Sequence, residues 1–215
     1  MKRFLSIFLA LVMLLAVMPV YASAAETTSP SCEAPESGTF VPMTKEDYAR
    51  YVAILENGSD LERASAVREI FERGNSAISP QSWSSTISEP QGDGTYLVQG
   101  FVTCSHTQNN MTIYTTVSAA MRGSNTAGYT WTDIGNGYSS AASGNYTYDD
   151  GGVSVRLTAP NKMYISVQGT FEIAASTASS IGVNLSVMNY SYSVSGTDYY
   201  RSQFTGYHVE FCPTR

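Results

Sequence analysis

A two-residue alternation of apolar and polar side chains runs through the chain after Gln81 and constrains its fold more than any other feature. The alternation is clearest in residues 96–104, 111–121, 164–173 and 181–187. Because successive side chains of a β-strand point to opposite faces, this period predicts strands that bury one face and expose the other. We therefore expect a mainly β fold, arranged as an antiparallel β-sandwich or a small barrel.

Turn motifs between the alternating segments favour antiparallel pairing. Residues 149–152 read Asp-Asp-Gly-Gly between two alternating runs, and Pro160 with Asn161 turns the chain again. Such motifs join neighbouring strands as hairpins. The alternation shifts by one residue near Met188 and Asn189, which predicts a β-bulge or a turn there. The short connections favour antiparallel neighbours over parallel crossovers.

Residues 44–75 have a different period and predict an N-terminal α-helical hairpin. Apolar residues recur three and four positions apart in two runs of this segment. Thr44 is suited to cap the first helix, and Ser59 with Glu62 forms a capping-box pattern before the second. Two short amphipathic helices bury too little surface alone, so we expect them to pack on the β domain, residues 76–215.

The first residues show the order of features of a secretory signal peptide. Lys2 and Arg3 precede a long apolar run that ends in small residues. We therefore predict a signal peptide over residues 1–25 and a secreted, extracellular protein. An uncleaved membrane anchor is the alternative interpretation. Residues 26–43 are rich in Ser, Thr, Pro and Glu, which predicts a flexible leader.

The acidic charge of the chain limits its partners. The full sequence has a net charge of −6, and subtracting the two positive charges of Lys2 and Arg3 gives −8 for the processed chain. Repulsion from phosphates opposes binding to nucleic acid and to anionic lipid surfaces, and it argues against electrostatic capture of polyanions. We expect no nucleic-acid partner. We also expect no cofactor, because no ligand-binding motif stands out.

The disulfide candidates are Cys32, Cys104 and Cys212. An exported chain meets oxidising conditions, so one disulfide and one leftover thiol are the simplest expectation. Three pairings are possible, and the spacing does not choose among them. No two of these cysteines have the close spacing of a zinc-thiolate motif, which argues against such a site.

The two histidines raise the hypothesis of a metal site. His106 follows Cys104 by two residues, whereas His208, Glu210 and Cys212 alternate along the last expected strand. If the two cysteines were directly opposite in an antiparallel pair, His106 would lie opposite Glu210. His208 would lie one diagonal step further along, and two imidazoles and a carboxylate could hold a metal ion. A cross-strand ion pair beside a disulfide is the alternative interpretation.

Sequence patterns for catalysis are weak. The chain has no Gly-x-Ser-x-Gly elbow of a serine hydrolase. A glycosidase would need two converging carboxylates, for which Glu172, Asp198 and Glu210 are the candidates in the sheet region. A secreted hydrolase is the alternative function, and His106, His208 and Glu210 would be its ligands in a metal-dependent version.

Aromatic residues give the main indication of function. They cluster in or beside the expected strands at Tyr129, Trp131, Tyr190, Tyr192, Tyr199 and Tyr200. Flat amphipathic rings on a rigid sheet contact sugars or proteins with little loss of conformational entropy. Alternatively, tyrosine simply suits half-buried strand positions. We predict a non-enzymatic extracellular or cell-surface binding module, with a carbohydrate or a protein as its partner.

A membrane-inserting β-protein is a second alternative. Residues 171–194 alternate Ser and Thr with apolar side chains, as a strand pair that refolds into a membrane barrel would. A soluble sheet shows the same alternation at its own surface, so we do not expect membrane insertion.

Overall fold

A computed structural model describes residues 36–74, 83 and 87–213 of the chain. These residues form a nine-stranded antiparallel sheet that is not closed, together with helices, so the predicted mainly β class with antiparallel pairing is confirmed. The predicted signal peptide and Cys32 lie outside the described residues. The strands are β1 (Glu36–Pro42), β2 (Glu89–Pro90), β3 (Tyr96–Gln108), β4 (Met111–Ser124), β5 (Gly128–Ala141), β6 (Thr147–Ala159), β7 (Lys162–Ala174), β8 (Tyr190–Val194) and β9 (Thr197–Phe211).

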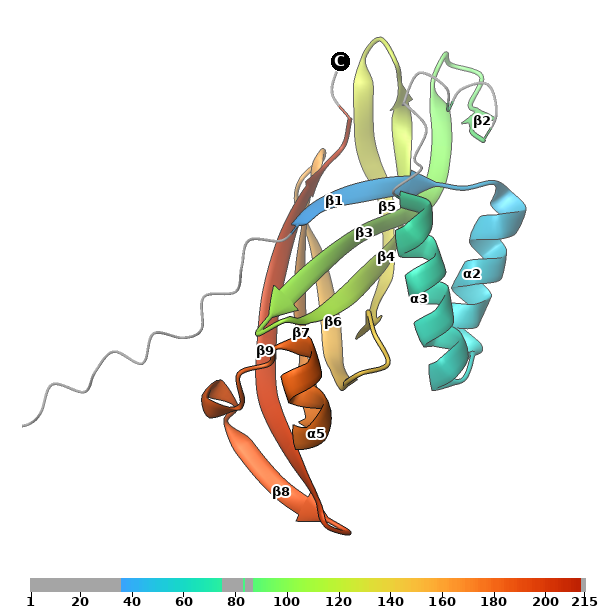
Figure 1. Ribbon diagram of the computed structural model, residues 1–215. Helices are drawn as coiled ribbons and strands as arrows, with labels where there is room; N and C mark the ends of the chain where they lie inside the picture. The colour runs from blue at the N-terminus through green and yellow to red at the C-terminus, as the bar shows by residue number, and fades with distance from the viewer. Residues whose placement is uncertain (1–35, 75–82, 84–86, 214–215) are drawn as a thin grey trace, which may run out of the picture. The chain divides into compact units, whose positions relative to one another are not determined.

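The strands follow the order β1-β3-β4-β5-β6-β7-β9-β8, with β2 paired to β3 (Figure 1). Strands β3 and β4 pair along their whole length around a tight turn at Asn109 and Asn110, both of which have positive φ. Strands β5 and β6 share a single registered pair, Gly137 with Val153. A Cβ at Gly137 would lie 2.3 Å from Val153 Cγ1, so this close approach requires glycine.

Strand β1 corrects the prediction that residues 26–43 form a flexible leader throughout. Residues 36–42 pair with β3 at the edge of the sheet, and Phe40 and Val41 are both buried. The backbone of β1 passes so close to β3 that a Cβ at Gly100 would lie 2.2 Å from the carbonyl oxygen of Val41. The Ser-, Thr- and Pro-rich composition did not indicate this strand, because only two adjacent apolar side chains anchor it.

Two other local predictions were wrong. Residues 149–152 form a bulge inside β6, not a hairpin turn, with Gly152 at a φ of 119° and its N–H donating to Asp150 Oδ1 at 2.9 Å. Residues 181–187 contain 3₁₀ turns instead of a strand. Their backbone reverses at Gly182, which adopts the left-handed conformation, and Asn184 caps the next turn. These elements are α5 (Ala175–Ala178), η1 (Ser179–Ile181) and η2 (Leu185–Val187).

The sheet curls so that the inner faces of β3 and β9 meet, although the two strands are not neighbours in it. The rings of His106 and Phe204 lie 5.8 Å apart, and Gln108 Nε2 donates to Ser202 Oγ at 3.2 Å. The core between these faces is built from alternate residues of the long strands. Its largest members include Met111, Ile113, Met121, Met163, Ile165, Phe171, Ile173 and Phe204.

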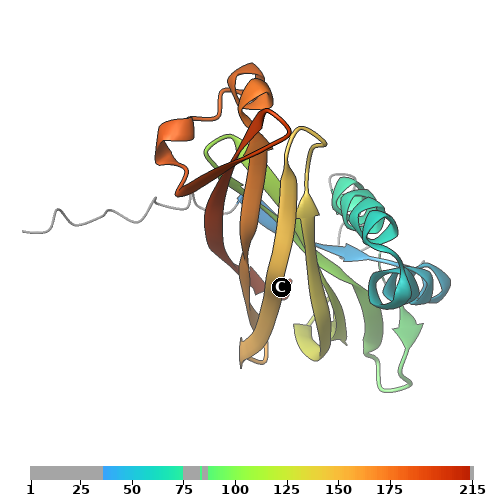
Figure 2. The ribbon, with the colours of Figure 1, turned by 90° about the horizontal axis from the view of Figure 1, so that it is seen from below.

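Helices α2 (Lys45–Asn57) and α3 (Asp60–Gly74) pack on the opposite face of β3 and its neighbours, as Figures 1 and 2 show. Phe101 is the sheet residue at the centre of this second core. Both predicted caps form: Thr44 Oγ1 accepts from the N–H of Asp47 at 3.2 Å, and the Ser59 N–H donates to Glu62 Oε2 at 2.8 Å. Local sequence therefore decides where each helix begins.

We expect Thr44→Ala to lower the free energy of unfolding by about 1 kcal/mol, because the first turn of α2 loses its side-chain acceptor. Urea denaturation followed by circular dichroism would measure the change. Thr44→Ser keeps the hydroxyl and should stay within a few tenths of a kcal/mol of the parent, to the order of magnitude known for caps. Equal loss in both variants would show that the hydroxyl is not the stabilising group.

Candidate binding surface

The outer face of β7, β9 and β8 brings together three of the tyrosines singled out from the sequence. Tyr192 on β8 pairs in register with Tyr199 on β9, and their stacked rings lie 5.4 Å apart at 20°. Tyr190 flanks Tyr192 at 6.2 Å and is 60% exposed. We call these three residues, with Glu172 and Arg201, the β8 patch.

Polar contacts hold the central ring of the β8 patch in place. The Tyr192 hydroxyl donates to Glu172 Oε2 at 2.8 Å, a hydrogen bond that raises the pKa of Tyr192. The guanidinium of Arg201 lies 5.0 Å from the centre of the same ring, and its Nε donates to Glu172. Three strands thus fix one ring before any ligand arrives, which reduces the entropy lost on binding.

The other three predicted aromatic residues lie elsewhere. Tyr129 and Trp131 are only 4% and 5% exposed, and Trp131 packs edge-on against Phe40 with ring centres 5.6 Å apart. Tyr200 points to the inner side of β9 and packs against the main core. None of the three contributes to the outer face. The sequence could not predict this, because alternation identifies the residues that share one face of a strand without showing which face is buried.

A second aromatic group lies on the same outer face and was missed in the sequence. The rings of Tyr164 and Tyr207 stack at 6.0 Å and 12°, and Phe211 is 54% exposed beyond them. The Arg156 guanidinium lies 4.8 Å from the centre of the Tyr164 ring, and Lys162 Nζ lies 5.5 Å from that of Phe211. We call these five residues the Arg156 patch. The sequence indication for this patch lay in the outward-facing residues of β9, Tyr207 and Phe211. They alternate with the more conspicuous His208, Glu210 and Cys212.

The register assumed for the metal hypothesis was wrong. Strand β3 lies between β1 and β4, and β9 lies between β7 and β8, so Cys104 cannot pair in a ladder with Cys212. On one side of each strand lies its hairpin partner, β4 for β3 and β8 for β9, because hairpins close the shortest loops. The other side is occupied by β1 and β7, respectively. Both of these cysteines are buried free thiols in the structure. Burial and the nearby Glu210 carboxylate raise the pKa of each thiol to about 12, so both are protonated at neutral pH.

The histidines do meet inside the sheet, although not as predicted. His106 Nε2 lies 3.6 Å from Cys104 Sγ, and His208 Nε2 lies 2.8 Å from Glu210 Oε2 on its own strand. Burial, with a smaller contribution from His208, lowers the pKa of His106 to about 4. In the described part of the chain, no group of three or more His, Cys, Asp or Glu side chains is arranged to hold a metal ion. The metal site therefore stays a prediction.

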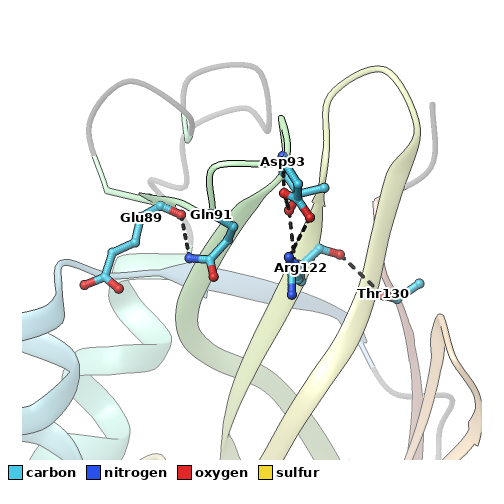
Figure 3. A network of polar contacts seen from close by, with 6 residues as sticks. Glu89, Gln91, Asp93, Arg122 and Thr130 are labelled. Atoms are coloured by element: carbon cyan, nitrogen blue, oxygen red, sulfur yellow. Dashed lines mark hydrogen bonds and ion pairs between the residues drawn. The ribbon is translucent and has the colours of Figure 1, made fainter.

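A cluster of polar residues at the ends of β3, β4 and β5 forms its hydrogen bonds and ion pairs within the cluster (Figure 3). Arg122 donates to Asp93 Oδ2 at 2.6 Å and to Thr95 Oγ1 at 3.0 Å, and its carbonyl oxygen accepts from Thr130 at 3.3 Å. Hydrogen bonds from Thr95, with a smaller contribution from Arg122, lower the pKa of Asp93 to about 2. This network fastens the loop before β3 to the sheet.

Comparisons with known proteins give no further guide. No protein-family model, curated protein or solved structure matches this chain. Of the helices that the structure describes, none is both long enough and apolar enough to cross a membrane. The function therefore has to be inferred from the two patches and the surface between them.

Proposed function

We propose that this chain is a secreted, non-enzymatic binding module whose outer face of β7, β9 and β8 binds an extracellular or cell-surface carbohydrate. The observation that carries the proposal is the β8 patch, in which Glu172 and Arg201 hold Tyr192 against Tyr199. Rings fixed in this way offer contact area with little further loss of entropy.

Exposed apolar side chains concentrate on this face. Four of the seven large hydrophobic residues that are exposed among the described positions lie on it: Tyr190, Val194, Tyr207 and Phe211. Exposed apolar residues grouped on one face of a soluble protein indicate an interaction site. The grouping therefore distinguishes this face from the rest of the described surface.

The middle of the face favours a sugar chain over a protein. Between the two patches, Thr205 pairs with Gln168 and Gln203 pairs with Thr170, all of them uncharged and polar. A protein interface has its apolar anchors near the centre and polar residues at the rim, whereas this face has the reverse order. From Tyr199 to Tyr207 the strand spans roughly 27 Å, so an extended ligand could reach both patches. Amides and hydroxyls in the middle would bond its hydroxyl groups.

For the architecture we propose that the curled sheet forms a barrel-like scaffold, on whose outside α2 and α3 pack as a helical hairpin. This arrangement leaves the outer face of β7, β9 and β8 uncovered by either helix, since their described contacts are with β1, β3, β4 and β5. The helices and the binding face would then occupy different strands of one sheet.

Replacing Tyr190 and Tyr192 together by alanine should weaken carbohydrate binding about tenfold or more, because the variant loses both a fixed ring and an exposed one. The processed protein would first be screened on a glycan array, and the affinity for the best ligand measured by calorimetry. Tyr96→Ala, a tyrosine on β3 outside this face, serves as the control. An unchanged affinity of the double variant, or a blank array, would contradict the proposal.

A further inference from the structure

We infer that the Arg156 patch recognises a carboxylate group, so that the ligand is a saccharide chain containing uronic acid units. The inference rests on the proposed function, since it names the class of carbohydrate that the same face binds. It follows from a difference in charge between the two aromatic patches.

The strand register places two cations among the rings of the Arg156 patch. Arg156 on β6 is paired with Tyr164 on β7, and Lys162 on β7 is paired with Phe211 on β9. Each cation lies over a ring, at 4.8 Å for Arg156 and 5.5 Å for Lys162. The charge of Arg156 therefore lies next to the stacked pair of Tyr164 and Tyr207, and Tyr207 is 57% exposed. The charge of Lys162 lies at the far end of the patch, over Phe211.

No acidic residue occupies the described outward positions of β6, β7 and β9 that surround these two cations. The outward positions of β6, β7 and β9 around the patch are occupied by Ser154, Ser166, Thr205 and Val209, besides the patch residues themselves. Glu210 points inward and bonds to His208. Among the residues that the structure describes, neither Arg156 nor Lys162 forms an ion pair.

The β8 patch is the internal comparison. Its cation, Arg201, forms an ion pair with Glu172, so the charges of these two patch residues offset each other. The Arg156 patch has the same combination of rings and cations but lacks the carboxylate. A ligand carboxylate placed there would supply the missing charge through charge-assisted hydrogen bonds, for which the arginine fork is well suited.

The net charge of −6 opposes the capture of a densely charged polymer, but it opposes recognition of single carboxylates at this patch much less. Long-range repulsion opposes the approach of nucleic acid or of anionic membranes, but at physiological ionic strength it is screened beyond about 8 Å. Contacts at hydrogen-bond distance within one patch are much less affected. Spaced carboxylates on sugar rings also suit the alternation of rings and hydroxyl side chains on this face.

The test compares a hyaluronan tetrasaccharide, in which every second sugar is a glucuronate, with the same tetrasaccharide after reduction of its carboxylates to alcohols. Calorimetry should show that the processed protein binds the acidic form about tenfold more tightly. Arg156→Gln combined with Lys162→Gln should remove this difference, because it lowers the affinity for the acidic form about tenfold more than the affinity for the reduced form. Lys45→Gln combined with Arg63→Gln removes the same charge from the helices and should preserve the preference.

Several outcomes would overturn the inference. Equal binding of the acidic and reduced forms would refute carboxylate recognition while leaving carbohydrate binding intact. Binding of neither form would refute the uronate class, and the glycan array would then decide the proposed function separately. An acidic tetrapeptide of glutamates that bound as tightly as the acidic sugar, and lost affinity with the Arg156 and Lys162 substitutions, would show that the patch recognises acidic protein segments instead.

Discussion

Phe101→Ala is expected to lower the free energy of unfolding by about 3–5 kcal/mol. Phe101 has no exposed surface and joins the sheet to the helices, because its ring lies 5.4 Å from that of Tyr48 and 6.3 Å from that of Tyr51. Truncation would leave a cavity that the long strand β3 and two helices cannot collapse to fill. Since single domains are stable by roughly 5–15 kcal/mol, this one change removes a large part of the total.

Urea unfolding monitored by circular dichroism and by aromatic fluorescence would measure the loss at Phe101. Leu61→Ala is the matched control, because Leu61 on α3 is 81% exposed and its truncation should change stability by no more than about 0.5 kcal/mol. If the helices detach and unfold before the sheet does, the circular dichroism signal of the helices will be lost at a lower urea concentration than the fluorescence signal. A loss below about 1 kcal/mol at Phe101 would contradict the described packing of α2 and α3 on the sheet.

The second large effect is a loss of stability in acid caused by His106. The pKa of this buried side chain is lowered to about 4, from about 6.5 in the unfolded chain. Between these two values the unfolded state binds the proton and the folded state does not, so stability falls as the pH is lowered from 6.5 to 4. The full difference amounts to about 3 kcal/mol, and below pH 4 the contribution no longer changes.

The surroundings of His106 explain why its charged form is disfavoured. It faces Cys104 on its own strand and Phe204, Gly206 and His208 on β9, and none of these offers a negative charge. Its Nδ1 has no hydrogen-bond partner among the described residues. Glu210, whose carboxylate acts on the two buried cysteines, is hydrogen-bonded to the other histidine.

Unfolding free energies measured at half-unit steps from pH 7 to pH 4 would test this effect. His106→Gln removes the titrating ring, so its stability should depend much less on pH in this range, whatever its stability at neutral pH. Asp93, whose pKa is lowered to about 2, loses its contribution to stability mainly below pH 4. It therefore adds little to the change in stability between pH 7 and pH 4. Equal slopes for the parent and the variant would show that His106 is not the group responsible.

Several features of the fold were predictable because they depend on neighbouring residues. The caps at Thr44 and at Ser59 with Glu62 form as expected, since each joins groups three positions apart. The alternation in β3, β4 and β7 was also recognised, because the period of a strand is visible in its own sequence. Residues 181–187 show where alternation alone fails to predict a strand, because the turn-forming residues Gly182 and Asn184 override a short alternating run.

The candidate surface was predicted only in part. Tyr190, Tyr192 and Tyr199 do gather on one face, because alternation and strand pairing bring them together. Arg156 and Lys162 could not be assigned to this surface from the sequence. Lys162 meets the Phe211 ring only through the pairing of β7 with the distant strand β9, and Arg156 meets Tyr164 on a face of the β6–β7 hairpin that alternation does not identify as exposed.

The amino-acid sequence was sufficient to establish the helix starts and the extended segments of β3, β4 and β7, because these follow from side chains within a few positions of one another. Which side of each strand is buried was decided only in three dimensions: Tyr199 faces outward while Tyr200 faces the core. The reason is that a two-residue period is unchanged when the two faces of a strand are exchanged. The strand order, with β9 beside β7 instead of β3, likewise depends on how distant segments pack, and that order determines which charges and rings share a surface.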